Sequence, residues 1–251
     1  MRSHRFPFLA ALILICAVSI HAKDTTQQLI VDLKFMPQEG VHSSTADLTS
    51  SMTEHPVTLQ IEDARGGADA LVIGEGTNDD DHLFPIRAST DPRQFVATAT
   101  EQIVTSWGLK TGAAADRTLL VRLTRFYVNE GNKAVGSVYA AEVKIAYKLS
   151  DKSGKALFEA ATSGTAHRYG RARSISNCNE VLSDALKEAV ANALSDSALQ
   201  TAWASGKSGA AASTQKESVE ERLKKLDELL QKGLITKEEH QKRRAEILKE
   251  I

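Results

Sequence analysis

The segment VGSVYAAEVKIAYKL, residues 135–149, alternates apolar and polar side chains. Successive side chains of a β-strand point to opposite faces of a sheet, so an alternation with period two predicts a strand that packs on one face and meets water on the other. This pattern is typical of an antiparallel sheet with one covered face. The predicted packed face consists of Val135, Tyr139, Ala141, Val143, Ile145, Tyr147 and Leu149.

Two neighbouring segments predict strands that complete a meander. Residues 118–128 alternate in the same way, and a turn at 130–132 joins them to 135–149. A second turn at 151–154 leads into residues 156–168, which also alternate. Strands joined by short turns pair with their neighbours in sequence, so these segments predict three antiparallel strands.

Shorter strands are predicted nearer the N-terminus. Residues 57–62 predict one strand, and residues 70–74 predict its short partner across an Arg-Gly-Gly turn. Residues 23–56 are predicted to form an N-terminal extension that contains one strand, at 29–35.

Two segments predict helices. In residues 91–108, Asp91 can cap the first turn, Pro92 suits the first helical position, and Gly108 provides a stop. The second helix is predicted to run from residue 177 to residue 203.

The second helix is predicted to start with a capping box formed by Asn177 and Glu180. Each predicted helix offers one apolar face, and the meander offers one packed face. Together they predict an α+β fold, an antiparallel meander sheet with two helices on one face, in the order β-α-β-β-β-α. This α+β domain is predicted to span residues 57–203.

The N-terminal residues predict a targeting segment and not part of the fold. Arg2 and Arg5 precede the apolar run 8–20, which as a helix would rise about 20 Å, too short for a bilayer core of roughly 30 Å. Residues 1–22 therefore predict a secretory signal peptide and delivery of the mature protein to the periplasm. Lipidation at Cys16 is the alternative, and membrane association is expected only in that case; the isoleucine before Cys16 is larger than the residue usual there.

The charge balance argues against a polyanionic partner. The chain has 31 basic and 32 acidic side chains, a net charge of −1. A chain with this balance has no excess of basic side chains to attract nucleic acid or an anionic membrane.

Cys178 falls on the apolar face of the second predicted helix. Burial of its thiol is therefore expected. A reactive thiol is the alternative, because a cysteine in the first turn of a helix has a lowered pKa.

Two clusters of charged residues are candidate sites. The sequence NDDDH at 78–82 could bind a metal ion, but consecutive carboxylates splay apart, so a solvated acidic loop is favoured. In the segment 167–173, basic side chains before a helix N-terminus could bind a phosphate or carboxylate, or could form salt bridges with 78–82. These side chains are His167, Arg168, Arg171 and Arg173.

No catalytic residue, metal site or cofactor is predicted. The sequence contains no Gly-x-Ser-x-Gly, HExxH or CxxC pattern. His55, His82 and His167 show no spacing typical of a ligand set.

The C-terminal part predicts a linker followed by a small helical hairpin. Residues 204–216 are a flexible linker by composition, and residues 217–251 predict two helices joined at Gly233. Thr236 is the predicted cap of the second helix. About 30 residues bury too little surface to be stable alone, so the apolar stripe is expected to need a partner surface.

This hairpin resembles the SHOCT (short C-terminal) domain, on the residues Leu226, Leu229, Gly233, Ile235, Thr236, Glu239 and Leu248. His240 stands where that family usually has Phe or Tyr. The resemblance implies oligomerisation or protein–protein contact. The predicted interaction residues are Leu223, Leu226, Leu230, Gly233, Leu234, Ile235, Thr236, Glu239, His240, Ile247 and Leu248.

The main domain shows an ordered series of features: the strand VTLQIEDAR, a loop, the helix that begins with DPR and ends in Trp-Gly-Leu, the strand LLVRLTRFYVNEGN, a second long strand, and a Ser-Asn-rich start to the last helix. In this order the main domain, about 57–200, resembles the YajG-type family of bacterial envelope lipoproteins. It implies an envelope protein and no known catalytic residues.

Together these observations predict a non-enzymatic, secreted protein of the bacterial cell envelope. It is expected to bind a protein partner or further copies of itself through the hairpin. One alternative is a metal-binding or hydrolytic periplasmic enzyme that uses the 78–82 loop. Another is a lipoprotein component of an envelope assembly or transport complex.

Overall fold

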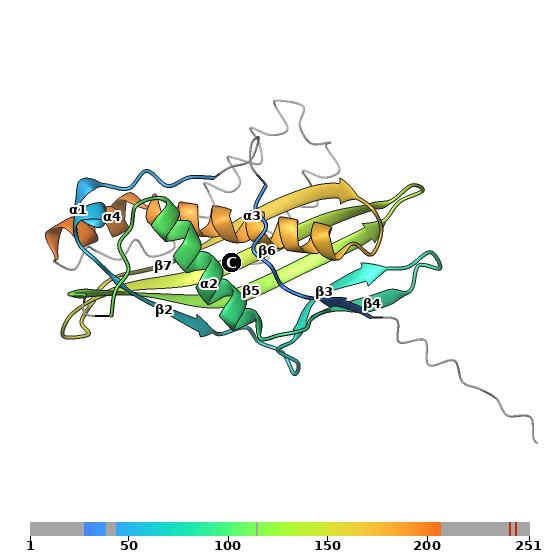
Figure 1. Ribbon diagram of the computed structural model, residues 1–251, viewed down its shortest axis with the longest axis horizontal. Coiled ribbons are helices and arrows are strands. Elements are labelled where there is room, and N and C mark those ends of the chain that lie inside the picture. The colour runs from blue at the N-terminus through green and yellow to red at the C-terminus, as the bar shows by residue number, and fades with distance from the viewer. Residues whose placement is uncertain (1–27, 39–43, 114, 207–240, 242–243, 245–251) are drawn as a thin grey trace, which may run out of the picture.

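The computed structural model describes residues 28–38, 44–113, 115–206, 241 and 244 (Figure 1). They form a seven-stranded sheet in the order β1-β4-β3-β5-β6-β7, and β2 also pairs with β5. The strands are β1 (Leu29–Val31), β2 (Thr58–Asp63), β3 (Val72–Thr77), β4 (Leu83–Ala88), β5 (Arg117–Asn132), β6 (Ser137–Asp151) and β7 (Ala156–Gly170). The helices are α1 (Ser50–Glu54), α2 (Pro92–Ser106), α3 (Ile175–Leu194) and α4 (Ser197–Ser205).

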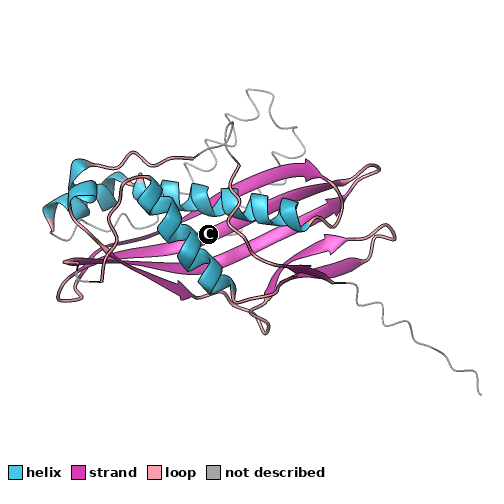
Figure 2. Cartoon of the chain, viewed as in Figure 1, coloured by secondary structure: helices cyan, strands magenta, loops and turns pink. Residues whose placement is uncertain are grey.

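The predicted meander is confirmed. β5, β6 and β7 pair in antiparallel fashion along nearly their whole length. The predicted packed face of β6 is buried from Tyr139 to Leu149, whereas Val135 lies outside the strand and is exposed. The helices cover this packed face (Figure 2), so the predicted α+β class is also confirmed. None of the described helices is long and apolar enough to cross a membrane.

A β-bulge in β5 changes which side chains face the helices. The register shifts between Leu123 and Arg125, and Thr124 is the extra residue. From Leu119 to Leu123 the odd-numbered residues are buried, but beyond the bulge Phe126, Val128 and Glu130 are buried. A bulge inserts one residue and so reverses the alternation.

The first turn of the meander lies later than predicted. Residues 130–132 belong to β5, and the Lys133 amide donates to the Gly136 carbonyl across the turn at 3.1 Å.

The sheet is mixed, so the prediction of a purely antiparallel sheet is wrong. β2 and β3 were expected to pair with each other, but both run parallel to β5, with β2 beside residues 118–123 and β3 beside residues 128–130. β5 is long enough to hold the two short strands one after the other. The antiparallel partner of β3 is β4, which the sequence analysis did not predict.

The predicted strand at 29–35 ends at Val31, where β1 stops pairing with β4. The chain then runs along α3 (Figure 1), whose side chains bind its backbone. The amides of Met36 and Gln38 donate to the Ser183 hydroxyl at 2.9 Å and to the Asp184 carboxylate at 2.8 Å. Side chains of α3 thus accept hydrogen bonds from backbone amides of residues 36–38 that would otherwise pair with a neighbouring strand.

The helix α2 begins and ends as predicted. The Asp91 carboxylate accepts a hydrogen bond from the Arg93 amide at 2.9 Å, and Gly108 adopts a φ of 91° just past the helix. Asp91 is thus a true N-cap, and the left-handed backbone at Gly108 stops the helix.

The single helix predicted from residue 177 to residue 203 is two helices. α3 starts earlier, capped by the Ser174 hydroxyl, and ends at Leu194. α4 then starts at Ser197, because Asp196 caps it through a hydrogen bond of 2.8 Å from the Ala198 amide.

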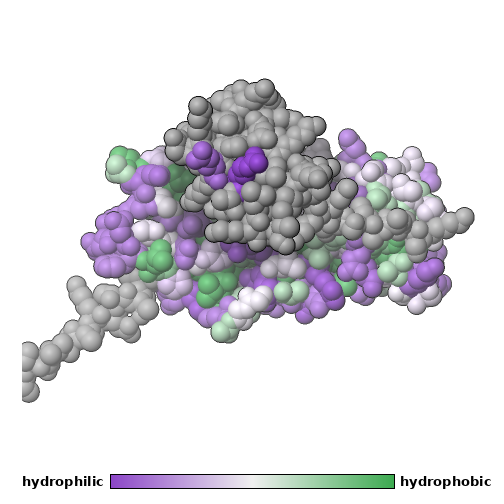
Figure 3. Space-filling view, turned by 180° about the vertical axis from the view of Figure 1, so that it is seen from behind, coloured by the Kyte–Doolittle hydropathy of each residue, from purple (hydrophilic) through white to green (hydrophobic). Residues whose placement is uncertain are grey.

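The core lies between the helices and the sheet. α3 packs on β6 and β7, and α2 packs beside α3 over β2. α3 lies close against β7 at Gly164, where a Cβ atom would overlap the Ala185 carbonyl oxygen and the Ala189 amide nitrogen. The described residues seen from the opposite side mix hydrophilic and hydrophobic surface (Figure 3).

Candidate functional site

Apart from Gln241 and Arg244, the predicted interaction hairpin lies outside the described residues. This applies to each of its predicted contact residues, from Leu223 to Leu248.

His167 and Arg168 are neighbours near the end of β7, so their side chains point to opposite faces of the sheet. Arg168 lies on the helix side, where its guanidinium forms an ion pair with Glu180 of α3. His167 lies on the other side and is exposed. The structure therefore does not bring these two cationic groups together.

Arg171 and Arg173 lie in the loop that enters α3, and main-chain groups of both residues bind buried side chains of the sheet. The Arg171 carbonyl accepts a hydrogen bond from the Tyr139 hydroxyl at 2.7 Å, and the Arg173 amide donates to Glu130 Oε1 at 2.6 Å. The Tyr139 hydroxyl also accepts from the Ser174 amide at 2.9 Å. Arg173 has a φ of 54°, in the left-handed region. This conformation costs energy for a residue other than glycine, so it persists because these hydrogen bonds hold the backbone in place.

Glu130 and Tyr139 anchor this loop, and both are buried, at 1% and 0% exposure. The sequence analysis placed Tyr139 on the packed face of β6 but assigned it no part in a site, and it did not single out Glu130. The signal of Glu130 is visible only once the bulge is known, because Glu130 then falls in phase with Phe126 and Val128. The Arg173 guanidinium lies over the Phe84 ring at 4.8 Å from its centroid.

The loop is therefore fixed through buried groups of the sheet. Anion binding by the 167–173 segment stays a prediction.

Cys178 lies beneath the same loop and is fully buried, as predicted. Burial, together with the charge of Glu130, raises the pKa of the Cys178 thiol to about 12. A thiol with so high a pKa is protonated at neutral pH, and the thiolate is the nucleophilic form. The reactive alternative therefore has no support.

The acidic loop 78–82 forms a tight turn organised by Asn78. Its side-chain oxygen accepts hydrogen bonds from the amides of Asp80 and His82 at 3.0 and 2.8 Å. The Asp79 carboxylate accepts from the Asn132 side chain at 2.8 Å. Among the described residues there is no group of three or more carboxylate, imidazole or thiol side chains placed to hold a metal ion.

A cleft of about 570 Å³ lies between the free edge of β2 and helix α2. At one end Val57 is bridged in parallel to the segment 110–112: its amide donates to the Lys110 carbonyl at 2.9 Å, and its carbonyl accepts from the Gly112 amide at 3.0 Å. At the other end Arg93 Nε donates to the Ile61 carbonyl at 3.1 Å. No pattern of side chains in the sequence predicts this cleft, because such patterns show which face of a strand is buried and not which edge is paired.

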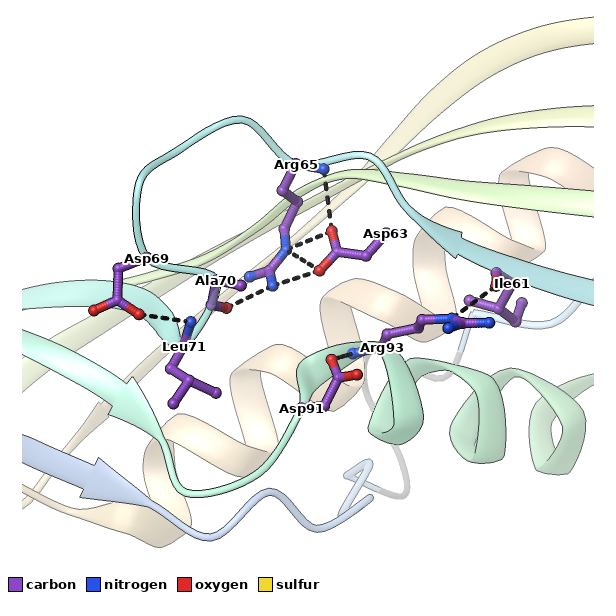
Figure 4. A network of polar contacts seen from close by, with 8 residues as sticks. All are labelled: Ile61, Asp63, Arg65, Asp69, Ala70, Leu71, Asp91 and Arg93. Atoms are coloured by element: carbon purple, nitrogen blue, oxygen red, sulfur yellow. Dashed lines mark hydrogen bonds and ion pairs between the residues drawn. The ribbon is translucent and has the colours of Figure 1, made fainter.

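Polar contacts brace the end of the cleft where β2 stops (Figure 4). The Arg65 guanidinium donates to both carboxylate oxygens of Asp63, at 2.9 and 2.7 Å, and to the Ala70 carbonyl at 2.8 Å. Burial alone would raise the pKa of Asp63, but the hydrogen bonds and charge of Arg65, together with the charge of Arg93, hold it below its usual value. The Asp63 carboxylate is thus already bound, and Arg93 is left at the mouth of the cleft.

Comparison with known proteins identifies two segments. Residues 44–203 match the family model described as "Uncharacterized lipoprotein". Residues 221–248 match the model described as "Short C-terminal domain". These matches confirm both resemblances inferred from the sequence, and the lipoprotein match suggests a location in the cell envelope. No curated protein matches the sequence.

The comparison with solved structures found matches of low sequence identity. Protein XCC0632 from Xanthomonas campestris is 10% identical, with a TM-score of 0.44 over 72% of this chain and 99% of that chain. The PelC dodecamer from Paraburkholderia phytofirmans is 13% identical, with a TM-score of 0.31 over 60% and 91%. A minor lipoprotein from Acinetobacter baumannii is 10% identical, with a TM-score of 0.29 over 55% and 92%.

Proposed function

Since the chain belongs to the family described as "Uncharacterized lipoprotein", we propose that it is a non-enzymatic protein of the bacterial cell envelope that acts by binding other proteins. The C-terminal hairpin is the proposed contact, and its partner is either a further copy of this chain or a different envelope protein. The match of residues 221–248 to the short C-terminal domain carries this proposal.

The need of the hairpin for a partner follows from its size. Its predicted apolar seam includes Leu226, Leu230, Ile235 and Ile247. Two short helices bury too little apolar surface to offset the conformational entropy lost on folding. Binding a second surface supplies the missing burial, which makes folding of the hairpin and association one event.

Two other functions belong to different classes. A metal-binding or hydrolytic enzyme would use the 78–82 loop, and stoichiometric zinc or calcium in the purified protein would favour it. The other is a lipid-anchored component of an envelope assembly or transport complex, and the word lipoprotein in the description of the family favours its lipid anchor. The residue that distinguishes this case from a soluble protein is Cys16.

We expect the mature protein to begin near Lys23 and to be released from the periplasm by osmotic shock. The reason is the bulky isoleucine before Cys16, which suits a lipoprotein cleavage site poorly. Intact-mass measurement and fractionation check both points. Recovery only in detergent, with acyl mass on Cys16 that is lost in Cys16→Ser, would show the lipid-anchored form instead.

The hairpin is tested by placing charges in its seam. In the double variant Leu226→Asp/Ile247→Asp, desolvating unpaired carboxylates costs several kcal/mol, more than so small a unit can supply. We expect light scattering to show a fall from the oligomer to the monomer. The unfolding transition of the main domain should stay unchanged, because the hairpin is predicted to join it only through a linker. The predicted start of that linker at residue 204 is too early, since Ala204 and Ser205 belong to α4.

The matched control is Lys224→Gln/Lys249→Gln, which makes the same change in net charge on the polar side of the predicted helices. It should keep the wild-type mass. If the seam variant also keeps the wild-type mass, and pulls down the same crosslinked envelope partners, the hairpin is not the association module.

A further inference from the structure

The strand β7 forms one edge of the sheet. It comes last in the strand order and has 15 residues. An outer edge of this length can pair with a strand of another molecule, and proteins usually block such an edge with lysine, with proline or with a covering element. β7 contains neither lysine nor proline, and no charged side chain lies between Glu159 and His167. Its own sequence therefore leaves the edge open to pairing.

The odd-numbered residues in the middle of β7 point their main-chain groups away from β6. In an antiparallel pair, opposite residues alternate between those that exchange hydrogen bonds and those that do not. The Lys144 carbonyl of β6 points toward β5, because it accepts from the Thr124 hydroxyl at 3.2 Å. Ser163 lies opposite Lys144, so its amide and carbonyl point to the outer edge, and those of Ala161 and Thr165 point the same way.

Two side chains of α3 occupy the centre of this edge. The Glu188 carboxylate accepts from the Thr165 amide at 2.6 Å, and the Asn192 side-chain amide donates to the Ser163 carbonyl at 3.0 Å. Four residues of a helix rise about 6 Å and two residues of a strand rise about 6.6 Å, so the two spacings match. Gly164 allows this reach, since a Cβ atom there would overlap the backbone of α3.

The carboxylate of Glu188 serves the strand edge and not a cationic side chain. None of the ion pairs among the described residues includes Glu188. A charged acceptor makes a stronger hydrogen bond to an amide than a neutral one does. The contact at Thr165 is therefore a strong one for an edge that faces water.

We propose that Glu188 and Asn192 form an autoinhibitory contact, which closes the β7 edge against the β7 edge of a second copy. A pairing strand has to bond to successive outward residues along the edge. Because the contact lies at Ser163 and Thr165, it removes the central bonds of such a ladder and leaves two shorter runs. Each bond lost at the centre makes the pairing weaker.

The partner excluded in this way is a second copy, because the edge is complementary to itself. When two antiparallel copies of β7 are centred on Ser163, Glu159 of one copy lies opposite His167 of the other, and both side chains are exposed. Opposite charges across a strand pair stabilise it. The small side chains of residues 160–166 let the two edges approach each other.

The contact bears on assembly through the hairpin but does not depend on it. Copies joined at their hairpins would hold their β7 edges at a high effective concentration. Closed edges keep the main domains from merging into one sheet, so the choice of partner is left to the hairpin.

The double variant Glu188→Ala/Asn192→Ala opens the edge. In full-length mature protein that also carries Leu226→Asp/Ile247→Asp, we expect light scattering to show a mass that roughly doubles as the concentration rises, because the freed edges pair. Adding Thr165→Pro should restore the mass of the background, since a proline ring replaces the central outward amide. A variant that associates only because it unfolds would not be rescued in this way.

Glu101→Ala/Gln102→Ala is the matched control, because it removes an exposed carboxylate and an exposed amide side chain from α2. It should keep the mass of its background. Glu188→Gln should keep it too, because the glutamine side-chain oxygen still accepts from the Thr165 amide. Each mass is compared with that of its own background, so the test holds whether or not the hairpin associates.

Amide hydrogen exchange measures the contact directly. In the wild type the Thr165 amide should exchange more slowly than the Ala161 amide, and in Glu188→Ala the two should exchange alike. Thermal unfolding shows that each variant is folded. The proposal is wrong if the double variant keeps the mass of its background at every concentration, if Thr165→Pro leaves the mass of the folded double variant unchanged, or if the two amides exchange equally in the wild type.

Discussion

Gly164→Val is expected to destabilise the main domain by about 3 kcal/mol or more, because it forces α3 away from β7. Valine suits a strand better than glycine, so local propensity would predict a gain in stability. The backbone of α3 prevents that gain. A Cβ atom at residue 164 would overlap the Ala185 carbonyl oxygen and the Ala189 amide nitrogen, which are backbone atoms and cannot rotate away. In a domain of this size the melting temperature should fall by roughly 10 °C.

Gly66→Val is the control for this substitution. Gly66 lies in the loop between β2 and β3, and a Cβ atom there would meet nothing within 4 Å. Its melting temperature should stay within a degree or two of the wild type. If Gly164→Val melts as the control does, α3 does not lie directly on β7.

The parts of the fold that could be predicted are the elements that bury one face and show an unbroken pattern of apolar and polar side chains. β6 and its two neighbours fit this description, because each has a long alternation and a short turn that leaves one choice of partner. The start of α2 could be predicted for a similar reason, since Asp91 and Pro92 act within one turn.

The parts that could not be predicted depend on partners distant in sequence. Nothing in residues 58–63 or 72–77 indicates that both strands pair with β5, because strand patterns show which face is buried and not which edge is occupied. The bulge at Thr124 is also hidden, since an extra residue in an alternating strand resembles ordinary irregularity. The boundary between α3 and α4 could have been predicted in part, because Asp196 is an acidic residue suited to cap a helix. The apolar stripe continues across Asp196, however, and a continuous stripe predicts a single helix.

The same division holds for the candidate sites. The basic side chains at 167–173 were found from their charge, yet their charge does not show where they point, and pairing within β7 separates His167 from Arg168. The cleft beside β2 depends instead on which edge of a strand is paired, and only the tertiary structure shows that. Among the described residues, Arg93 donates from its side chain to the Ile61 carbonyl at this edge.

Trp203→Ala is expected to cost about 3–5 kcal/mol, the usual range for removing a buried large aromatic side chain. Trp203 lies on α4 and is fully buried, the largest side chain of the core to be so. Its removal leaves a void that the surrounding β-sheet and α3 cannot close by small shifts. Urea unfolding followed by circular dichroism should show a lower midpoint with an unchanged slope, because the same surface is exposed on unfolding.

Two further variants separate the possible causes of this loss. The Trp203 indole Nε1 has no hydrogen-bond partner within the described part of the chain, so Trp203→Phe removes little besides volume and should cost much less than Trp203→Ala. Trp107 lies at the end of α2 and is only partly buried, so Trp107→Ala should cost less than half as much as Trp203→Ala. Equal losses for the two alanine variants would mean that α4 is not packed into the core, and that the main domain ends before residue 197.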